Sequence, residues 1–287
     1  MALRAGFIGL GNIGKPMARR LVAAGLETTV LDLAEAPVRE LVAAGAKAAA
    51  TPREAAAASD YLGICVRDDA DLASLMAGAD GVLAGAAPGT VVAVHSTVLP
   101  RTVERFAAEA APRDVAVLDA CITGGAPGAA QGTLTVMIGG DAAAIDRIRP
   151  ALAAFARTVV HAGPLGAGAK LKLCNNLMTY LAWTAAQEAT ALAKAAGLSD
   201  EVFEEVTRSN GNLTEPMRAF LALHRAPEAT RRSPGFQALL RSFVDLAEKD
   251  LAATLALARE HHVALPGAAV VSQIMARVYG LDDEGRR

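Results

Sequence analysis

A glycine-rich turn between two short apolar runs, close to the N-terminus, limits what this chain can fold into more than any other feature. The first run, residues 5–10, leads into Gly9-Leu10-Gly11-Asn12-Ile13-Gly14, and a helical pattern then continues to about residue 24. The second run, residues 28–33, contains Asp32, 18 residues beyond Gly14. Strand, Gly-x-Gly-x-x-Gly, helix, strand and acidic residue in this order predict a Rossmann-type dinucleotide-binding unit rather than a structural glycine-rich turn.

Each glycine of this turn has its own expected task. Gly9 permits the tight turn, Gly11 lets a pyrophosphate approach the backbone, and Gly14 lets the helix pack on the strand. The start of the helix presents unpaired N–H groups and its positive dipole end to the phosphates. We expect cofactor contacts from the whole turn: Gly9, Leu10, Gly11, Asn12, Ile13 and Gly14.

Asp32 indicates which dinucleotide is preferred. Its carboxylate can accept hydrogen bonds from the adenosine ribose hydroxyls and would repel a 2′-phosphate. The adjoining Leu33 and Ala34 supply no guanidinium to offset that repulsion. NAD is therefore the expected cofactor, with NADP as the alternative. A purely structural interpretation of Asp32 is a cap for a helix that begins near residue 36.

Strand and helix patterns continue to alternate to about residue 162, which predicts a doubly wound sheet. Further strands are expected at residues 61–66, 91–95, 115–120, 133–139 and 158–162. In such a sheet the loops after the carboxyl ends of the strands face the ligand. Four residues are candidate cofactor contacts by that position, although turn formation explains each equally well: Val66, Arg67, Asp71 and Thr97.

Residues 121–128, Cys-Ile-Thr-Gly-Gly-Ala-Pro-Gly, are predicted to form a loop after one of these strands. Small residues allow consecutive backbone N–H groups to converge on an anion, and the Thr123 hydroxyl adds a donor. A substrate carboxylate is the natural guest, held by Thr123, Gly124 and Gly125. A merely flexible loop is the competing interpretation.

A long helix is predicted from Gly168 to about residue 196, in a part of the chain without strand patterns. Lys172, Asn175 and Asn176 stand at i, i+3 and i+4 and so share one face of its first turns. Polar groups on an otherwise apolar helix are unfavourable to bury without purpose. A solvated first turn is the alternative.

The predicted fold class is α/β: an N-terminal Rossmann-type doubly wound sheet, then an all-α domain, joined by a long interdomain helix. The expected domains are residues 1–163 for the cofactor and residues 164–287 for substrate and oligomerisation. More helices are predicted from Ser199, over residues 236–261 and after Pro266, with an irregular segment over residues 208–234.

The totals exclude several classes of protein. Twenty-eight basic residues nearly balance 30 acidic ones, without a charge run, so neither nucleic acid nor an anionic membrane is an expected partner. The three scattered cysteines predict reduced thiols in the cytoplasm and no metal site. The apolar second domain suggests a homodimer or homotetramer.

Spaced motifs resemble those of the β-hydroxyacid dehydrogenase family, which includes 3-hydroxyisobutyrate dehydrogenase and tartronate semialdehyde reductase. They are the glycine turn at 6–14, Asp-Ala-Cys-Ile-Thr-Gly-Gly at 119–125, Gly-Thr-Leu-Thr-Val-Met-Ile-Gly-Gly at 132–140, Lys-Leu-Cys-Asn-Asn at 172–176 and Lys-Asp-Leu at 249–251. The resemblance covers nearly the whole chain in the right order.

This resemblance implies a role for individual residues. Lys172 matches the catalytic lysine and Asn176 the asparagine that holds the substrate, with Asn175 beside it. Thr123, Gly124 and Gly125 match the loop that binds the substrate carboxylate, where the family usually has serine at 123. Thr97 matches a threonine beside the nicotinamide, and Lys249 a lysine that contacts the cofactor.

Two features depart from the family pattern or leave a choice open. Arg67 stands where proline is common. Tyr180 and Trp183 follow Asn176 on the same helix face, and they either line a roomier pocket or pack in the helical core. His95, at a strand end, is expected to have a packing role.

The reaction that this resemblance implies is reversible hydride transfer between a nicotinamide and the β-hydroxyl, or semialdehyde carbonyl, of a small carboxylic acid. Lys172 would act as general acid and base. Because a free lysine with a pKa near about 10.4 is a poor base at neutral pH, burial is expected to lower its pKa. The alternatives are an imine reductase of the same architecture, which Lys172 disfavours, and a non-catalytic NAD-binding scaffold.

Overall fold

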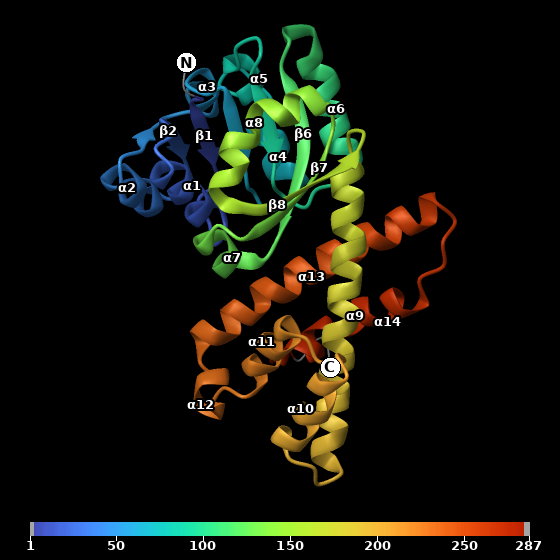
Figure 1. The fold of residues 1–287 in the computed structure, drawn as a ribbon. Coiled ribbons are helices and arrows are strands. Elements are labelled where there is room, and N and C mark those ends of the chain that lie inside the picture. Colours follow the sequence, from blue (N-terminus) through green and yellow to red (C-terminus); the bar gives the residue numbers. More distant parts are fainter. Residues whose placement is uncertain (1–2, 284–287) are drawn as a thin grey trace. The chain divides into compact units, whose positions relative to one another are not determined.

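The computed structural model describes residues 3–283, and these fall into two compact units (Figure 1). The division lies between Lys172 and Leu173, inside a long helix, whereas the expected domain boundary at 163/164 precedes that helix. Unit 1 denotes the residues up to Lys172, and unit 2 denotes those from Leu173.

Unit 1 is built on one eight-stranded sheet with the order β3-β2-β1-β4-β5-β6-β7-β8. All neighbouring strands are parallel except β6 and β7. The strands are β1 (Ala5–Ile8), β2 (Thr28–Leu31), β3 (Lys47–Ala48), β4 (Tyr61–Ile64), β5 (Val91–Val94), β6 (Ala116–Thr123), β7 (Leu134–Gly139) and β8 (Ala156–Gly163). From β1 the chain first adds β2 and β3 on one side and then crosses over to add β4 on the other side. Sheets of this kind bind ligands at this switch point.

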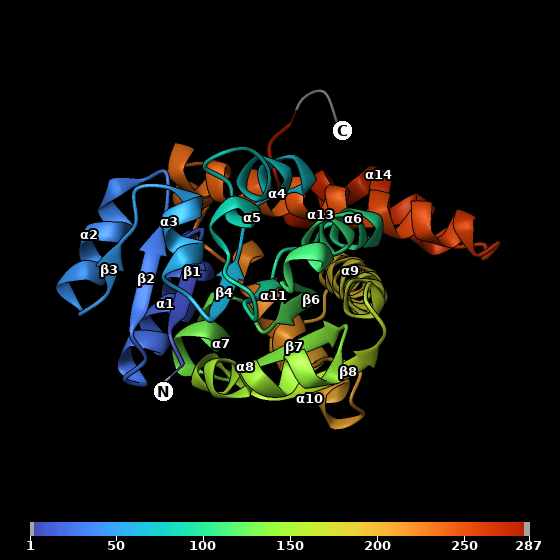
Figure 2. The same ribbon diagram turned by 90° about the horizontal axis from the view of Figure 1, so that it is seen from above.

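Helices cover both faces of this sheet (Figure 2). They are α1 (Gly14–Ala23), α2 (Glu35–Ala43), α3 (Pro52–Ala57), α4 (Asp69–Met76), α5 (Val82–Gly85), α6 (Pro100–Ala110), the short turn η1 (Ala111–Arg113), α7 (Gly125–Gln131) and α8 (Ala142–Phe155). Two of these helices start at a capping residue that lies next to them in the sequence. Thr51 caps α3 by accepting from Glu54 N at 3.1 Å, and Asp141 caps α8 by accepting from Ala144 N at 2.8 Å.

Two apolar clusters, one on each face of the sheet, form the core of unit 1. One packs α1 and α8 around Phe7, Met17 and Phe155; the other packs α3 to α6 around residues such as Ile64 and Phe106. Each fully buried side chain of this size contributes about 1.5–3 kcal/mol. The carboxyl ends of β1, β4 and β5 are thereby held in fixed register.

Unit 2 is entirely helical over the residues that the structure describes. It contains most of α9 (Ala167–Ala195), then α10 (Asp200–Ser209), α11 (Glu215–His224), α12 (Glu228–Arg231), α13 (Pro234–Glu260) and α14 (Pro266–Tyr279). The prediction of an irregular segment over residues 208–234 is wrong. Thr214 caps α11 by accepting from Met217 N, and Pro216 occupies its first turn, where proline starts a helix rather than breaking it.

The predicted fold class is therefore confirmed. A doubly wound sheet is followed by helices, and α9 runs from the first unit into the second. Within residues 3–283, none of the helices has both the length and the apolar character that crossing a membrane requires.

Candidate active site

In the glycine turn after β1, two positions have no room for a side chain and one position does. A Cβ on Gly9 (φ +91°) would lie 2.1 Å from the Cys65 carbonyl oxygen, and one on Gly14 would lie 1.9 Å from the Gly9 oxygen. Gly11 faces open space, with no heavy atom within 4 Å of its Cβ position. Packing alone thus explains Gly9 and Gly14, whereas Gly11 keeps the backbone accessible from outside.

The start of α1 is suited to an anion. Its N-cap residue Ile13 makes no side-chain cap hydrogen bond, and its first turn has no acidic residue. Backbone N–H groups and the positive dipole end are therefore directed at the open space beside Gly11. The turn fits the pyrophosphate of a dinucleotide.

Asp32 directly follows β2 and ties that strand to the glycine turn. Its Oδ2 accepts from Leu10 N at 2.5 Å and its Oδ1 from Ala34 N at 2.7 Å. Helix α2 begins with Ala34 as its N-cap and without a cap bond from the Ala34 side chain, so Asp32 also bonds the start of α2, through the N–H group of its N-cap residue. The carboxylate stands fixed beside the turn, where an adenosine ribose would lie in a Rossmann-type site.

Residues after β4 and β5 follow the same sheet edge as the glycine turn. Val66 N donates to Ser96 Oγ at 2.7 Å, which joins the two loops, and the half-buried Thr97 comes next. Arg67 donates to both oxygens of Asp71, at 2.8 and 3.0 Å. Hydrogen bonding with Arg67 lowers the pKa of Asp71.

His95, at the end of β5, confirms its expected packing role. Its Nε2 lies 2.7 Å from Tyr61 Oη and its Nδ1 lies 2.7 Å from the Ala120 oxygen. The ring stacks on Phe7 and meets the edge of Phe155. Burial lowers the pKa of His95 to about 4, so the ring is neutral.

Residues 121–128 do not form the predicted loop. Strand β6 continues to Thr123, where it pairs with Thr135 of β7, and α7 begins at Gly125. Pairing with β7 extends β6 beyond residues 115–120, where the apolar pattern predicted the strand. Gly124 (φ +119°) and Gly125 (φ +63°) are both left-handed, which reverses the chain directly beside Thr123.

The first turn of α9 is held on β6 by Asp119, which sequence reasoning did not single out as a site residue. The Asp119 carboxylate is 1% exposed and accepts from Gly166 N at 2.8 Å and Ala169 N at 2.6 Å. Lys172 follows Ala169 by three residues and is half-buried. The sequence does contain a signal for this role, because Asp119 is an acidic residue inside the apolar run 115–120.

A second buried carboxylate, Asp250 of α13, organises unit 2. It is 1% exposed; its Oδ2 accepts from Asn176 Nδ2 at 2.7 Å and from Tyr180 Oη at 3.0 Å, and its Oδ1 lies 3.3 Å from Lys249 Nζ. Asn175 Nδ2 donates to Asn176 Oδ1 at 3.3 Å. The structure thus joins three predicted site residues, Asn175, Asn176 and Lys249, through an aspartate that was not predicted.

Tyr180 and Trp183 make the contacts of core packing. Trp183 stacks on Phe220 with ring centroids 5.0 Å apart, and it meets Tyr180 and Tyr279 edge-on. Tyr180 is 5% exposed, and burial raises its pKa. The packing interpretation is confirmed for both side chains.

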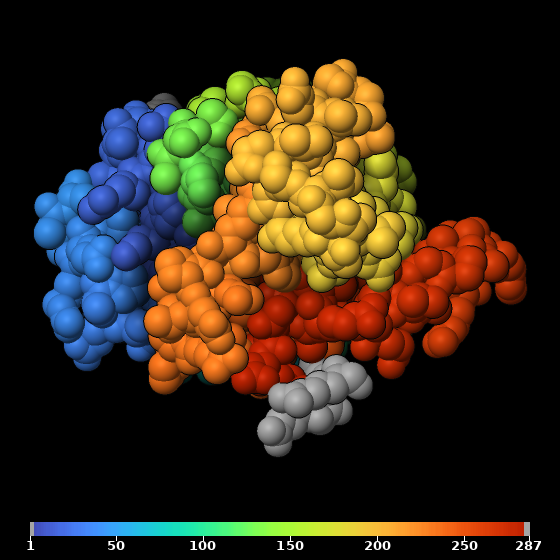
Figure 3. All heavy atoms as spheres, turned by 90° about the horizontal axis from the view of Figure 1, so that it is seen from below, coloured from blue at the N-terminus to red at the C-terminus, as the bar shows by residue number. Residues whose placement is uncertain are grey.

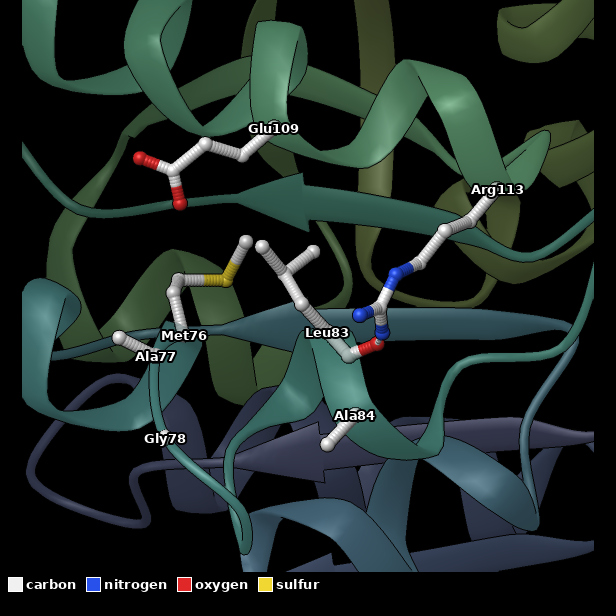
Figure 4. Close-up of a pocket in the computed structure, with 7 residues that line it drawn as sticks. All are labelled: Met76, Ala77, Gly78, Leu83, Ala84, Glu109 and Arg113. Atoms are coloured by element: carbon white, nitrogen blue, oxygen red, sulfur yellow. Dashed lines mark hydrogen bonds between the residues drawn. The ribbon is translucent and has the colours of Figure 1, made fainter.

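A surface depression of about 250 Å³ lies elsewhere in unit 1 (Figure 4). Its lining comes from the ends of α4 and α6, from α5 and from η1: Met76, Ala77, Gly78, Leu83, Ala84, Glu109 and Arg113. Helices α4 and α6 start at the carboxyl edge of the sheet and return toward its amino edge. The depression is therefore remote from the glycine turn.

Comparison with known proteins agrees with this arrangement. Residues 4–163 match the family model for the NAD-binding domain of 6-phosphogluconate dehydrogenase, and residues 166–285 match that for the NAD-binding domain of NADP-dependent 3-hydroxyisobutyrate dehydrogenase. The fold and the glycine turn define an NAD(P)-dependent oxidoreductase.

Individual relatives make the assignment more specific. The NAD-dependent L-serine dehydrogenase of Pseudomonas aeruginosa is 40% identical over 238 residues, which cover 82% of this chain and 80% of that protein. The crystal structure of 3-hydroxyisobutyrate dehydrogenase from Salmonella typhimurium is 32% identical with a TM-score of 0.83, covering 96% of this chain and 93% of the other. An imine reductase from Myxococcus stipitatus, 20% identical with a TM-score of 0.67 over 99% of this chain and 97% of its own, shares the fold alone.

The chain belongs to the 3-hydroxyisobutyrate dehydrogenase family of NAD(P)-dependent β-hydroxyacid dehydrogenases.

Proposed function

We propose that this protein oxidises the β-hydroxyl of a small carboxylic acid reversibly, with Lys172 as general acid and base. The observation that carries the proposal is the placement of Lys172 in the second turn of α9, whose first turn is bonded to the strand that ends at Thr123. Such an oxidation needs a base held at a defined place relative to the group that binds the substrate carboxylate, and this anchoring of the helix supports that arrangement.

The bound nicotinamide would supply the hydride acceptor, and the protein would position the substrate and move one proton. Lys172 accepts the hydroxyl proton during oxidation and returns it during reduction. Desolvation of the ammonium lowers its pKa toward neutrality in this proposal. Thr123, Gly124 and Gly125 hold the substrate carboxylate, and Asn175 and Asn176 orient its hydroxyl.

The proposed cofactor is NAD, held by the glycine turn, Gly9 to Gly14, and by Asp32. The negative charge of Asp32, fixed by Leu10 N and Ala34 N, would lie close to a 2′-phosphate and repel it. Val66, Thr97 and Lys249 are proposed as further contacts. Arg67 and Asp71 would act there as an ion pair.

The proposed substrate class is the 3-hydroxy acids. The two relatives are named for L-serine and 3-hydroxyisobutyrate. Both compounds carry a primary hydroxyl two carbons from a carboxylate. This shared chemistry supports a primary β-hydroxyl as the oxidised group.

A homodimer or homotetramer is also proposed. Exposed apolar side chains recur along α9 at intervals of three, four or seven residues, namely at Cys174, Met178, Ala185, Ala189 and Leu192, and α10 adds Val202 and Val206. The yellow and gold surface in Figure 3 contains the end of α9 and α10. The three cysteines are far apart in the sequence and form no Cys-x-x-Cys pair, which supports a reducing, cytoplasmic location.

The test is NADH formation, followed by absorbance, with 3-hydroxyisobutyrate, L-serine and glycerate, each with NAD and NADP. Lys172→Ala is expected to lower kcat by at least about 10³-fold while NAD binding stays within twofold. Lys170→Ala is the matched control, because Lys170 is exposed on the same helix; its kcat should not change.

Three results would contradict the proposal. Wild-type turnover in Lys172→Ala would remove the assigned role of the lysine. Tight NAD binding without turnover of any hydroxy acid would favour the scaffold. Reduction of cyclic imines but not of semialdehydes would favour the imine reductase.

A further inference from the structure

Asp119 is a buried carboxylate that the proposed proton transfer does not use. Its oxygens accept from the backbone N–H groups of Gly166 and Ala169, and Gly168 N–H is a third hydrogen-bonding neighbour. These groups belong to the start of α9, where a helix has donors without intrahelical partners. Asp119 therefore caps α9 from a strand that lies 47 residues earlier in the chain.

The start of α9 lies directly on the sheet. A Cβ on Gly168 would be 2.5 Å from the Met137 carbonyl oxygen, and one on Gly139 would be 2.6 Å from Asp119 Oδ1. No side chain fits between helix and strands at this point. Lys172 is three residues beyond Ala169, a rise of about 4.5 Å along the helix, so little backbone separates the anchored amide from the lysine.

Strand β6 carries both Thr123, which is proposed to bind the substrate carboxylate, and Asp119, which anchors the helix of Lys172. Thr123, at the end of β6, follows Asp119 by four residues, about 13 Å of extended chain. Asp119 joins β6 to the helix that bears Lys172. The position of the lysine relative to the carboxylate-binding residue thus depends on a strand and one cap.

The Asp119 cap is a carboxyl group that lies in the interior of unit 1. Burial raises the pKa of Asp119, and the hydrogen bonds from Ala169 and Gly166 offset that effect only in part. A carboxyl group whose pKa is raised by folding contributes stability at low pH and loses it as pH rises through the folded value. Ionisation of Asp119 is thus opposed by burial and favoured by the backbone donors at the start of α9.

We propose that Asp119 is a positioning residue for Lys172: its carboxylate fixes the first turn of α9 on β6 and so sets where the ammonium group stands relative to Thr123. This inference rests on the proposed role of Lys172.

The test uses Asp119→Asn in the full-length protein, because the amide replaces one acceptor oxygen with a donor. Hydrogen exchange at the amides of residues 166–169 should become faster. With 3-hydroxyisobutyrate or L-serine, whichever the wild type turns over, kcat should fall about 10- to 100-fold. The KM for NAD should stay within twofold, because the glycine turn is not altered.

Two further variants control the result. Gly168→Ala pushes the same turn away from the Met137 oxygen and should give the same loss of kcat, even if Asp119→Asn fails to fold. Asp141→Asn is the matched control, because Asp141 caps α8 by accepting from Ala144 N, and α8 carries no proposed site residue. Exchange should rise at the start of α8 without any change in kcat.

The outcomes separate this inference from the function on which it rests. Faster exchange at residues 166–169 with wild-type kcat would overturn the positioning role, and so would unchanged exchange in both α9 variants. An equal fall in kcat for Asp141→Asn would reduce the effect to general destabilisation and overturn it as well. Wild-type turnover in Lys172→Ala would instead overturn the proposed function, and the positioning role with it.

Discussion

The two units bind the same helix, α9, through one buried aspartate each, but the aspartates contact different groups. In unit 1, Asp119 accepts from backbone amides of the first turn. In unit 2, Asp250 accepts from the side chains of Asn176 and Tyr180. Backbone bonds fix where the helix begins, whereas side-chain bonds fix which way individual polar groups face.

This difference indicates how each unit should respond to change. Unit 1 has a second polar network, Tyr61–His95–Ala120, buried in its sheet. In unit 2, three side chains contact a single buried carboxylate, that of Asp250; they are Asn176, Tyr180 and Lys249. Loss of that carboxylate should therefore affect unit 2 more than any comparable single change affects unit 1.

The largest effect is expected for Asp250→Ala. Removing the carboxylate leaves buried partners in Asn176 and Tyr180 unsatisfied, which should lower the free energy of unfolding by about 2–4 kcal/mol. Trp183 is the single tryptophan and lies in unit 2, so its fluorescence during urea unfolding reports that unit. The Trp183 transition should shift to lower urea.

Asp245→Ala provides the matched control, because Asp245 is exposed on the same helix; its transition should move by no more than about 0.5 kcal/mol. Equal shifts for Asp245→Ala and Asp250→Ala would contradict the assigned importance of the buried cluster. A shift confined to unit 1 would reverse the comparison between the units.

A smaller, pH-dependent effect is expected from His95 in unit 1. Its pKa is lowered to about 4 by burial, so folding requires the neutral ring. Such a group contributes its full stability above the unfolded pKa, near about 6.5, and loses it as pH falls toward the folded value. The loss amounts to about 2 kcal/mol between pH 7 and pH 5.

The measurement is urea unfolding followed by circular dichroism between pH 7 and pH 5. His95→Gln removes the titrating ring, and its stability should fall less steeply than that of the wild type. Burial also lowers the pKa of His224 in unit 2, so the Trp183 transition should move with the same sign in both proteins. Identical pH slopes for the two proteins by circular dichroism would show that His95 is not responsible.

Local chemistry made much of unit 1 predictable. The glycine turn, the caps at Thr51 and Asp141, and the apolar strands depend on residues only a few positions apart. The predicted strand at residues 115–120 ends too early, because the end of β6 is fixed by pairing with β7 rather than by its own apolar pattern. Residues 208–234 were wrongly predicted as irregular because a proline in the first turn of α11 resembles a helix breaker.

The polar centres of the candidate site were harder to predict, because their partners are far apart in sequence. Asn176 and Asp250 are 74 residues apart, and Asp119 and Ala169 are 50 apart. Sequence spacing placed Lys172, Asn175 and Asn176 on one helix face. It could not reveal that the Asn176 amide is bonded to a carboxylate of another helix.

The smallest effect is expected at the exposed pair Arg67–Asp71 of unit 1, which also uses side chains but in solvent. Arg67 is 84% exposed, so the pair should contribute no more than about 1 kcal/mol. Arg67→Ala and Asp71→Ala should each leave the urea midpoint nearly unchanged. If the two side chains act on the cofactor only as a pair, both variants should weaken NAD binding equally, by less than about threefold, in a fluorescence titration. A tenfold loss for Arg67→Ala alone would instead make Arg67 a direct cofactor contact, and an exposed side chain of unit 1 would then matter to the site as much as the buried cluster of unit 2.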